Sequence, residues 1–224
     1  MTPFARFRQH VQDQPDAVAC ITPYRVATYR KMWSRIERST ARLQGEWGIL
    51  PGDIIAYVGC GHLDALVMYL AAARCGACVL PLEHAALQAR AAVIVAEVGA
   101  VLVLHDDALP PTSDLPPGMA CRPLSTLIAT ICRHRESVAE DSAAPSLLQW
   151  PRQSVASADP VRQIGALHRA SIEQLAHETV LSATAEARSF SGPMFDNAVF
   201  GPLVLATLLA GQTLSFASGV SADS

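Results

Sequence analysis

The spacing of apolar residues changes repeatedly along the first hundred positions, and each change predicts a different secondary structure. Recurrence every three or four residues predicts helices at 4–14, 64–74 and 87–97, and one that begins at 28 and ends near 45–48. Short continuous apolar runs predict buried strands at 17–21, 54–58, 78–82 and 101–104. Strands that alternate with helices across short, glycine-punctuated joints predict an α/β fold, in which crossover helices connect the strands of a parallel sheet.

The second half of the chain is less regular. Residues 108–123 hold five of the 15 prolines and predict an irregular connection. We therefore predict an α/β subdomain, a polar linker and a second α/β segment, with the boundaries 1–132, 133–145 and 146–224. Within the last segment the pattern predicts a strand, two helices and a final strand, at 146–150, 171–187, 198–210 and 213–216.

Composition narrows the classes of function. Half of the residues are hydrophobic and 17% are charged, which excludes a disordered chain. The 17 basic residues are scattered and the net charge is −3, so no basic face exists to bind nucleic acid. The apolar runs are too short to span a bilayer and the first residues carry no apolar signal core, so we expect a cytoplasmic protein that does not contact a membrane. The high apolar fraction favours a surface covered by a second copy or another protein.

Few side chains form a recognisable chemical site. The six cysteines lie mostly in apolar stretches and are expected to be reduced, buried thiols. Cys75 and Cys78 form a C-x-x-C pair, but a joint between a helix and a strand favours a packing role over a redox role. The run 105–107 could bind a cation, although a solvated turn is favoured. Gly59 and Gly61 could belong to a nucleotide loop, but the third glycine is missing and a tight turn is favoured. No histidine or cysteine spacing predicts a metal site.

The order of several segments identifies a family resemblance. The segments 15–20 (PDAVAC), 27–29 (ATY), 47–56 (WGILPGDIIA) and 70–82 (LAAARCGACVLPL) resemble the amino-terminal part of the adenylate-forming superfamily. This superfamily includes acyl-CoA synthetases, aryl-acid ligases and adenylation domains of nonribosomal peptide synthetases. The later segment 195–199 is similar to a substrate-pocket segment of the amino-acid-activating branch. The resemblance implies that Phe195 and Asp196 belong to a substrate pocket; alternatively, Asp196 caps the following helix.

The segment in the place of the family's phosphate loop is altered. That loop is rich in serine, threonine and glycine, ends in Pro-Lys-Gly and is soon followed by a histidine. Here the segment is 154–164, before His168, and other residues occupy the glycine and lysine places: Ala156, Asp159, Gln163 and Arg162. Glycines allow backbone N–H groups to approach phosphates, and Asp159 adds a negative charge, so we expect phosphate binding to be lost. The resemblance assigns any remaining nucleotide contact to Ser154, Ser157, Arg162 and His168.

The resemblance also implies which catalytic parts are missing from the matched region. The family's acidic nucleotide- and magnesium-binding segments, and its lid with a catalytic lysine, lie downstream of the residues matched here. The single lysine, Lys31, falls in the second predicted helix. A charge that develops at the α-phosphate therefore has no lysine to stabilise it. We expect no catalytic residue, no metal and no cofactor in this chain, and ATP–Mg binding only if the altered loop retains its role.

Three functions remain open. The first is a truncated, non-catalytic homologue that acts through binding, as a homodimer or with a partner protein. The second is the acid-substrate half of a split, ATP-dependent carboxylate-activating ligase. The third is a carrier or sensor of a small carboxylic acid.

Overall fold

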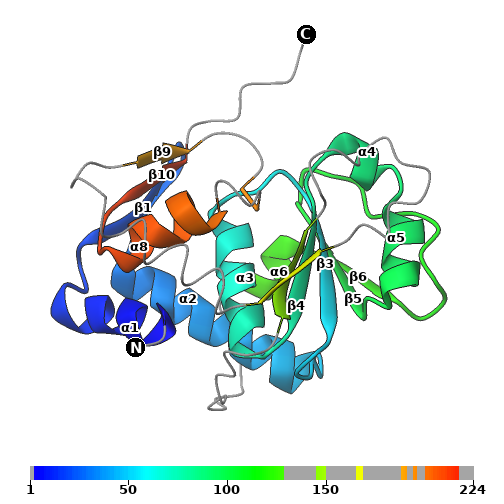
Figure 1. Cartoon of the computed structure of the whole chain (residues 1–224), viewed down its shortest axis with the longest axis horizontal. Helices are drawn as coiled ribbons and strands as arrows, with labels where there is room; N and C mark the ends of the chain where they lie inside the picture. The colour runs from blue at the N-terminus through cyan, green and yellow to red at the C-terminus, as the bar shows by residue number, and fades with distance from the viewer. Residues whose placement is uncertain are drawn as a thin grey trace, which may run out of the picture. The chain divides into compact units, whose positions relative to one another are not determined.

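The computed structural model describes residues 3–128, 145–149, 165–168, 188–190, 194–195 and 200–216 (Figure 1). The chain forms two compact units that interleave along the sequence. The first unit comprises Met1–Ser34, Gly61–Leu63 and Ser171–Ser224, and the second comprises Arg35–Cys60 and Asp64–Ala170. Residues 129–144 lie outside the described part of the chain, so the boundaries 1–132, 133–145 and 146–224 stay a prediction.

A six-stranded sheet forms the second unit and confirms the predicted α/β fold. Its strands lie in the order β6-β5-β3-β4-β7-β8, and all neighbours pair in parallel except β7 and β8, which are antiparallel. The strand bounds are β3 Ile54–Val58, β4 Cys78–Leu82, β5 Leu102–His105, β6 Ala120–Pro123, β7 Pro145–Gln149 and β8 Gly165–His168. Strands β3, β4 and β5 are the predicted ones, to within one residue. They are buried along most of their length, as a parallel sheet covered by helices requires.

The helices of this unit differ from the prediction at one place. The helix bounds are α3 Leu63–Arg74, α4 Ala85–Gln88, α5 Ala91–Val98 and α6 Leu124–Ile128. The helix predicted at 87–97 is divided into α4 and α5, because Arg90 leaves the helical conformation (φ −115°, ψ 11°). Gly99 then ends α5 in the left-handed conformation (φ 68°), as its position predicted. The prediction missed β6 and α6, which fall in or after the proline-rich connection.

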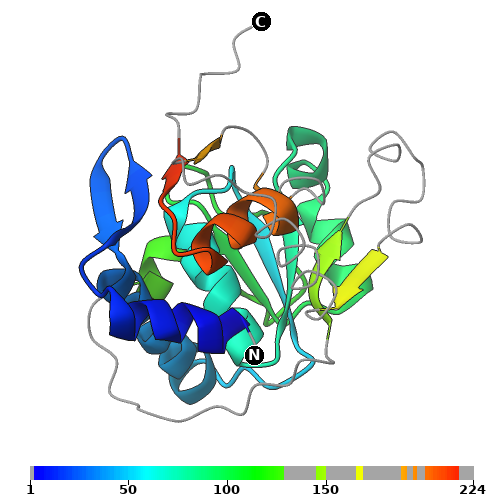
Figure 2. The same ribbon diagram turned by 60° about the vertical axis from the view of Figure 1, so that its left-hand side comes forward.

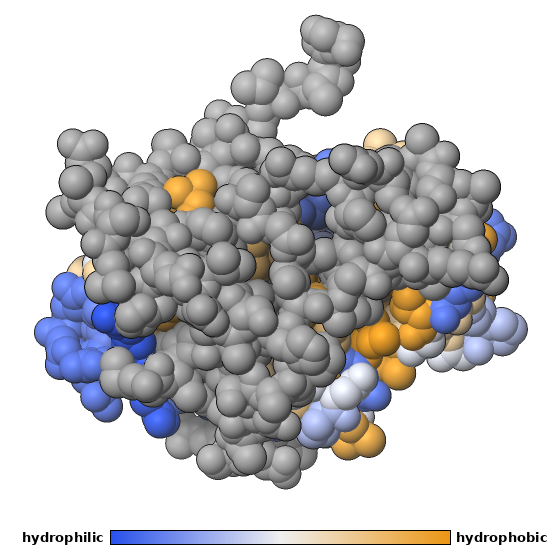
Figure 3. Space-filling view, viewed as in Figure 1, coloured by the Kyte–Doolittle hydropathy of each residue, from blue (hydrophilic) through white to orange (hydrophobic). Residues whose placement is uncertain are grey.

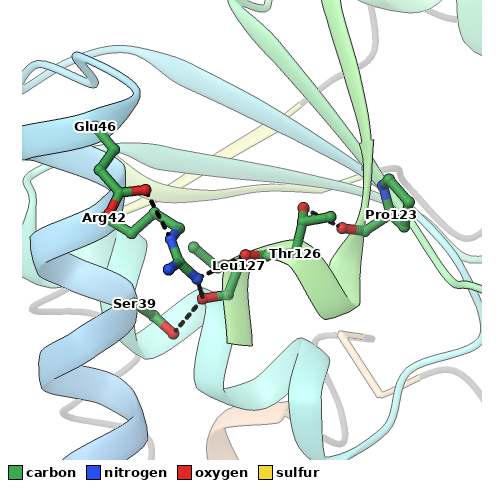
Figure 4. Close-up of polar contacts among 6 residues, drawn as sticks. All are labelled: Ser39, Arg42, Glu46, Pro123, Thr126 and Leu127. Atoms are coloured by element: carbon green, nitrogen blue, oxygen red, sulfur yellow. Dashed lines mark hydrogen bonds and ion pairs between the residues drawn. The ribbon is translucent and has the colours of Figure 1, made fainter. Parts of the chain in front are cut away.

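A buried arginine fastens α6 to the preceding helical layer (Figure 4). Helix α2 (Tyr29–Ala41) continues into a π-helical turn, η1 (Arg42–Glu46). The Arg42 guanidinium donates to the backbone oxygens of Thr126 at 2.7 Å and Leu127 at 3.1 Å, and its Nε donates to Glu46 at 3.0 Å. These carbonyls belong to the last turn of α6, where helices leave their acceptors unsatisfied. Arg42 is 7% exposed, so its charge is desolvated and depends on these partners.

The first unit joins residues from the two ends of the sequence in one sheet (Figure 2). Its strands lie in the order β2-β1-β10-β9, with β1 antiparallel to β2 and parallel to β10. The bounds are α1 Pro3–Asp13, β1 Val18–Thr22, β2 Arg25–Thr28, β9 Arg188–Phe190, η3 Phe200–Leu205, α8 Ala206–Leu209 and β10 Leu214–Phe216. The predicted helix at 4–14 and strand at 213–216 are confirmed, whereas β2 was not predicted. The helix predicted at 171–187 lies outside the described residues.

Side chains from α1 and α2 hold the end of α8. The Tyr29 hydroxyl donates toward the backbone oxygens of Leu208 at 3.0 Å and Gln212 at 2.9 Å. His10 Nε2 lies 2.9 Å from the oxygen of Leu209, and its ring packs against that of Tyr29. Gly211 ends α8 in the left-handed conformation (φ 75°), with its N–H donating to the Leu208 oxygen at 3.2 Å and the Gln212 N–H donating to the Thr207 oxygen at 3.1 Å. The amino-terminal helices therefore add side-chain contacts to a helix end that its own backbone already caps.

Within the described ranges, no helix is both long enough and apolar enough to cross a bilayer. Figure 3 shows a hydrophilic surface over α1, where the exposed residues are Arg8, Gln9, Gln12 and Asp13.

Candidate functional site

Strands β7 and β8 flank the altered phosphate-loop segment. Residue Gln149 at the end of β7 lies opposite Gly165 at the start of β8, so the two ends of the intervening segment are adjacent. Strand β7 runs parallel to β4, so the segment leaves the sheet at the carboxyl edge of the parallel strands. Adjacent strands are about 4.8 Å apart, which puts the end of β7 about 10 Å from the end of β3. Open α/β sheets bind their ligands at this edge.

The residues predicted for nucleotide contact are only partly placed. Ser154, Ser157 and Arg162 lie outside the described residues. His168 ends β8, where its backbone lies opposite Pro145. Because Gly165 begins β8 at the carboxyl edge, the antiparallel direction of β8 carries His168 three residues toward the opposite edge. The assignment of these four residues stays a prediction.

A buried carboxylate occupies the carboxyl edge between β3 and β5. The Tyr57 hydroxyl donates to Asp106 Oδ1 at 2.6 Å, and the backbone N–H of Cys60 donates to Asp106 Oδ2 at 2.8 Å. Asp106 is 8% exposed, and His105 beside it is also buried. The expected solvated turn at 105–107 is therefore wrong for these two residues and holds only for Asp107, which is exposed and accepts from the Ser125 N–H at 3.1 Å.

The same carboxylate explains the glycine that follows β3. A Cβ at Gly59 would overlap the Tyr57 hydroxyl and lie 2.5 Å from Asp106 Oδ2. Only glycine allows the chain to turn this close to the buried pair. The backbone oxygen of Gly59 also accepts from Gln88 Nε2 at 3.1 Å. The favoured interpretation of this segment as a tight strand-to-helix turn is thus confirmed, and its cause is the contact with Asp106.

The five described cysteines divide into buried and accessible thiols, and the sixth, Cys132, lies outside the described residues. Cys20, Cys75 and Cys78 are buried, as expected, whereas Cys60 is exposed and Cys121 is half-buried, which corrects the expectation for those two. Burial raises the pKa of Cys75 to about 12, slightly opposed by Arg74, and burial raises the pKa of Cys78 to about 12. Thiols held protonated in this way are poor nucleophiles, which supports a packing role for the C-x-x-C pair.

The exposed thiol of Cys60 is also less reactive than that of an ordinary cysteine. Partial burial raises its pKa first, and the carboxylates of Asp106 and Glu83 raise it further. Among the described residues, no group of three or more histidine, cysteine and carboxylate side chains is arranged to hold a metal ion.

The predicted pocket residue Phe195 lies in the first unit. Its side chain is 2% exposed and its ring centroid is 5.0 Å from that of Phe200 at the start of η3. Asp196 lies outside the described residues, so its two interpretations, pocket residue and helix cap, both stay open. Lys31 is exposed in the first turn of α2, where its N–H donates to the capping Thr28 Oγ1 at 3.3 Å.

Sequence reasoning missed the Tyr57–Asp106 pair and Arg42. A tyrosine inside a strand that is otherwise aliphatic was the available signal for the first, because a buried hydroxyl requires an acceptor. The spacing of Arg42 and Glu46 indicated at most a surface ion pair, and nothing local revealed the burial of Arg42, since its backbone partners are more than 80 positions away in the sequence.

Comparison with known proteins identifies the family to which the chain belongs. The sequence profile of the AMP-binding enzyme family matches residues 7–181, and the chain therefore belongs to this family of adenylate-forming proteins. Among curated proteins, malpibaldin synthetase of Mortierella alpina is 29% identical over 98 residues, which are 44% of this chain and 2% of that protein.

Solved structures show the same fold. An o-succinylbenzoate CoA synthetase of Bacillus subtilis superposes with a TM-score of 0.80 at 14% identity, covering 96% of this chain and 44% of that one. The amino-terminal subdomain of Klebsiella oxytoca NpsA, in complex with 3-hydroxyanthranilyl-AMSN, has a TM-score of 0.75 at 21% identity, covering 99% of this chain and 55% of that one. The chain thus spans about half or less of the length of these proteins and matches their amino-terminal region.

Proposed function

We propose that this chain is a member of the AMP-binding family that does not form adenylates and acts through binding, as a homodimer or with a protein partner. The observation that carries the proposal is the composition of residues 154–164, between two strands that are paired at the carboxyl edge of the sheet. That position suits a phosphate loop, whereas the residues in it do not.

Three changes in the segment oppose phosphate binding. Ala156, Asp159 and Gln163 carry side chains where the family has glycines, and a side chain disfavours the positive φ angles that turn N–H groups toward phosphates. Asp159 adds a negative charge to the segment, and a negative charge repels a polyphosphate. Arg162 keeps a positive charge, but a planar guanidinium does not replace the compact ammonium of a lysine.

A second candidate is retention of the acid-binding half of the family's activity. The chain would then be a carrier or sensor of a small carboxylic acid, or would supply the acid site of a split ligase. The NpsA subdomain supports this candidate, because its complex contains 3-hydroxyanthranilyl-AMSN and the fold it shares with this chain covers 99% of the present sequence. Phe195 and Asp196 are the residues proposed to line that site.

The proposed setting is the cytoplasm. Cys20, Cys75 and Cys78 are buried and in no disulfide, and Cys60 is exposed and in no disulfide. Free thiols of this kind persist in a reducing compartment.

Calorimetric titration with ATP–Mg tests the first proposal. We expect no saturable heat at millimolar ATP from the wild-type chain. The matched variant restores the loop with Ala156→Gly, Asp159→Gly, Gln163→Gly and Arg162→Lys. Binding by this variant alone would assign the loss to the loop, and saturable binding by the wild-type chain would overturn the proposal.

Titration with 3-hydroxyanthranilate and with L-phenylalanine tests the second candidate. Binding of either acid, with L-phenylalanine binding lost in Asp196→Asn, would favour a carrier or an acid half-site. If neither acid binds at millimolar concentration, the acid site is rejected and the binding role is left to protein partners.

A further inference from the structure

One hairpin carries much of the exposed apolar surface. Of the six large apolar side chains that stand out as exposed in the described structure, three lie within residues 21–26: Tyr24 is 94% exposed, Val26 53% and Ile21 38%. Ile21 and Val26 lie directly opposite each other in the β1–β2 pair, so they share a face. The opposite face is buried, through Cys20 and Ala27. The hairpin therefore has apolar residues on both of its faces.

The backbone of β2 is also available. Among the described strands, β2 pairs with β1 alone and lies outermost in its sheet (Figure 2). Both backbone groups of Arg25 face Thr22 across the two-residue turn, because its N–H donates to Thr22 Oγ1 at 3.0 Å and its C=O accepts from that hydroxyl at 3.1 Å. Ile21 and Val26 therefore form the next, non-hydrogen-bonded pair. The N–H and C=O of Val26 consequently point away from β1. An edge strand of this kind is a template for another strand.

We propose that β2 of one chain pairs antiparallel with β2 of a second copy, with the two Val26 residues opposite each other. In a symmetric dimer the two-fold axis passes between two copies of the same residue. For these two residues to form a hydrogen-bonded pair, the N–H and C=O of each must point away from β1, and those of Val26 do. Thr28 also points outward, but as the N-cap of α2 its C=O accepts the first helical hydrogen bond. The register is therefore set by the hairpin and the helix cap together.

This register makes the exposed face self-complementary. It aligns Ile21, Val26, Val26 of the second copy and Ile21 of the second copy in one row of β-branched side chains across the joined sheets. Rows of this kind stabilise neighbouring strands. Tyr24 falls opposite Thr28 of the second copy, and Arg25 falls opposite Ala27, so no like charges face each other. The proposal identifies the surface of the homodimer in the proposed function and rests on that function.

The size of the surface predicts a weak dimer. A large aromatic side chain buries roughly 150–250 Å² and the two β-branched residues are already half covered. The sum is well below the roughly 800 Å² per partner of a standard interface. Association is therefore expected at high micromolar concentration, on the order of 100 μM, and not as an obligate dimer.

Sedimentation equilibrium between roughly 10 μM and 1 mM tests the surface. We expect a concentration-dependent dimer for the wild-type chain and at least a tenfold weaker one for Val26→Lys, because two like charges would then lie opposite each other. The matched control is Val93→Lys, in α5, since Val93 is 52% exposed and lies outside the hairpin. The control is expected to dimerise like the wild type.

Hydrogen exchange tests the register. The Val26 amide should exchange more slowly at 1 mM than at 10 μM, by a factor set by the fraction of chains in the dimer. The exchange rate of the Ala27 amide, which faces β1, should not change with concentration. A wild-type monomer at all concentrations, or a dimer that Val26→Lys leaves intact, would overturn the proposal. Both measurements are made without ATP, so they do not depend on the test of phosphate binding. A chain that stays monomeric and also fails to bind ATP would rule out this dimer surface and would leave the proposed loss of phosphate binding intact.

Discussion

The buried carboxylate of Asp106 offers the sharpest test of how the carboxyl edge of the sheet is built. Asp106→Ala removes the acceptor of two hydrogen bonds, from the Tyr57 hydroxyl at 2.6 Å and from the Cys60 N–H at 2.8 Å. Asp106→Asn is the matched variant, because it keeps the shape and one acceptor oxygen while it removes the charge. An amide NH₂ can donate to the tyrosine oxygen, so the asparagine variant can retain both contacts.

The two variants are expected to differ in stability. Tyr57 is fully buried, so in the alanine variant its hydroxyl loses its acceptor without access to bulk water. Cys60 is exposed, and water can satisfy its N–H. The lost charged hydrogen bond and the buried hydroxyl without an acceptor together lower the free energy of unfolding by about 2–4 kcal/mol in Asp106→Ala. Asp106→Asn keeps both contacts and loses only the charge, so its free energy of unfolding should fall by about 1 kcal/mol. Tyr57→Phe combined with Asp106→Ala should cost less than the sum of the single changes by about 1–2 kcal/mol.

Urea unfolding gives these free energies, and alkylation of Cys60 gives an independent readout. The Asp106 charge is one of the groups that raise the pKa of Cys60, after burial, so its removal in Asp106→Asn lowers that pKa. Iodoacetamide should then modify Cys60 faster at pH 8, as followed by peptide mass spectrometry. Equal stability of the alanine variant and the wild type, or an unchanged Cys60 rate in the asparagine variant, would refute the arrangement.

Two further predictions concern the second unit. Arg42→Met should lower the free energy of unfolding by about 2–4 kcal/mol, because the Thr126 carbonyl loses its charged donor and the Leu127 carbonyl keeps only the longer contact from Ser39 Oγ, at 3.5 Å. Arg30→Met, which breaks an exposed ion pair with Asp16, should cost less than about 1 kcal/mol. Equal losses in urea unfolding would contradict the role of Arg42. The pKa values of Cys75 and Cys78 are raised from 9.0 to about 12 by burial, so the unfolded chain releases these protons first and stability should fall as pH rises from about 9 to 12. Urea unfolding at pH 8 and 10.5 should show a smaller loss in Cys75→Ala/Cys78→Ala than in the wild type, and identical losses would refute the burial argument.

The elements that the sequence predicted well are those with long or strongly apolar patterns. Strands β3 and β4 were predicted to the residue, because a run of five apolar residues after a glycine-containing turn leaves little alternative. Helix α2 was found from its cap at Thr28 and its apolar face. The elements missed, β2, β6, α6, β8 and β9, have three to five residues each and draw their stability from neighbours, so local preference does not reveal them.

For the candidate site, the sequence identified the segment and the structure supplied its surroundings. The order of short motifs indicated the family, which the profile match over residues 7–181 confirmed, and the residues in the loop indicated lost phosphate binding, which stays a prediction. The burial of Asp106 could not be foreseen, because an aspartate after a strand is ordinarily solvated. Its partner Tyr57 lies 49 positions away in the sequence and meets it through the pairing of β3 with β5.

The sequence by itself determined the α/β class, the family and the positions of the main strands, since these follow from periodicity and from the order of motifs along the chain. Only the tertiary structure decided which polar side chains are buried, which strand is left at an edge and which carbonyls Arg42 and Tyr29 satisfy. Each of these depends on contacts between residues that are distant in the sequence, and a pairing across 80 or more positions leaves no trace in the local pattern.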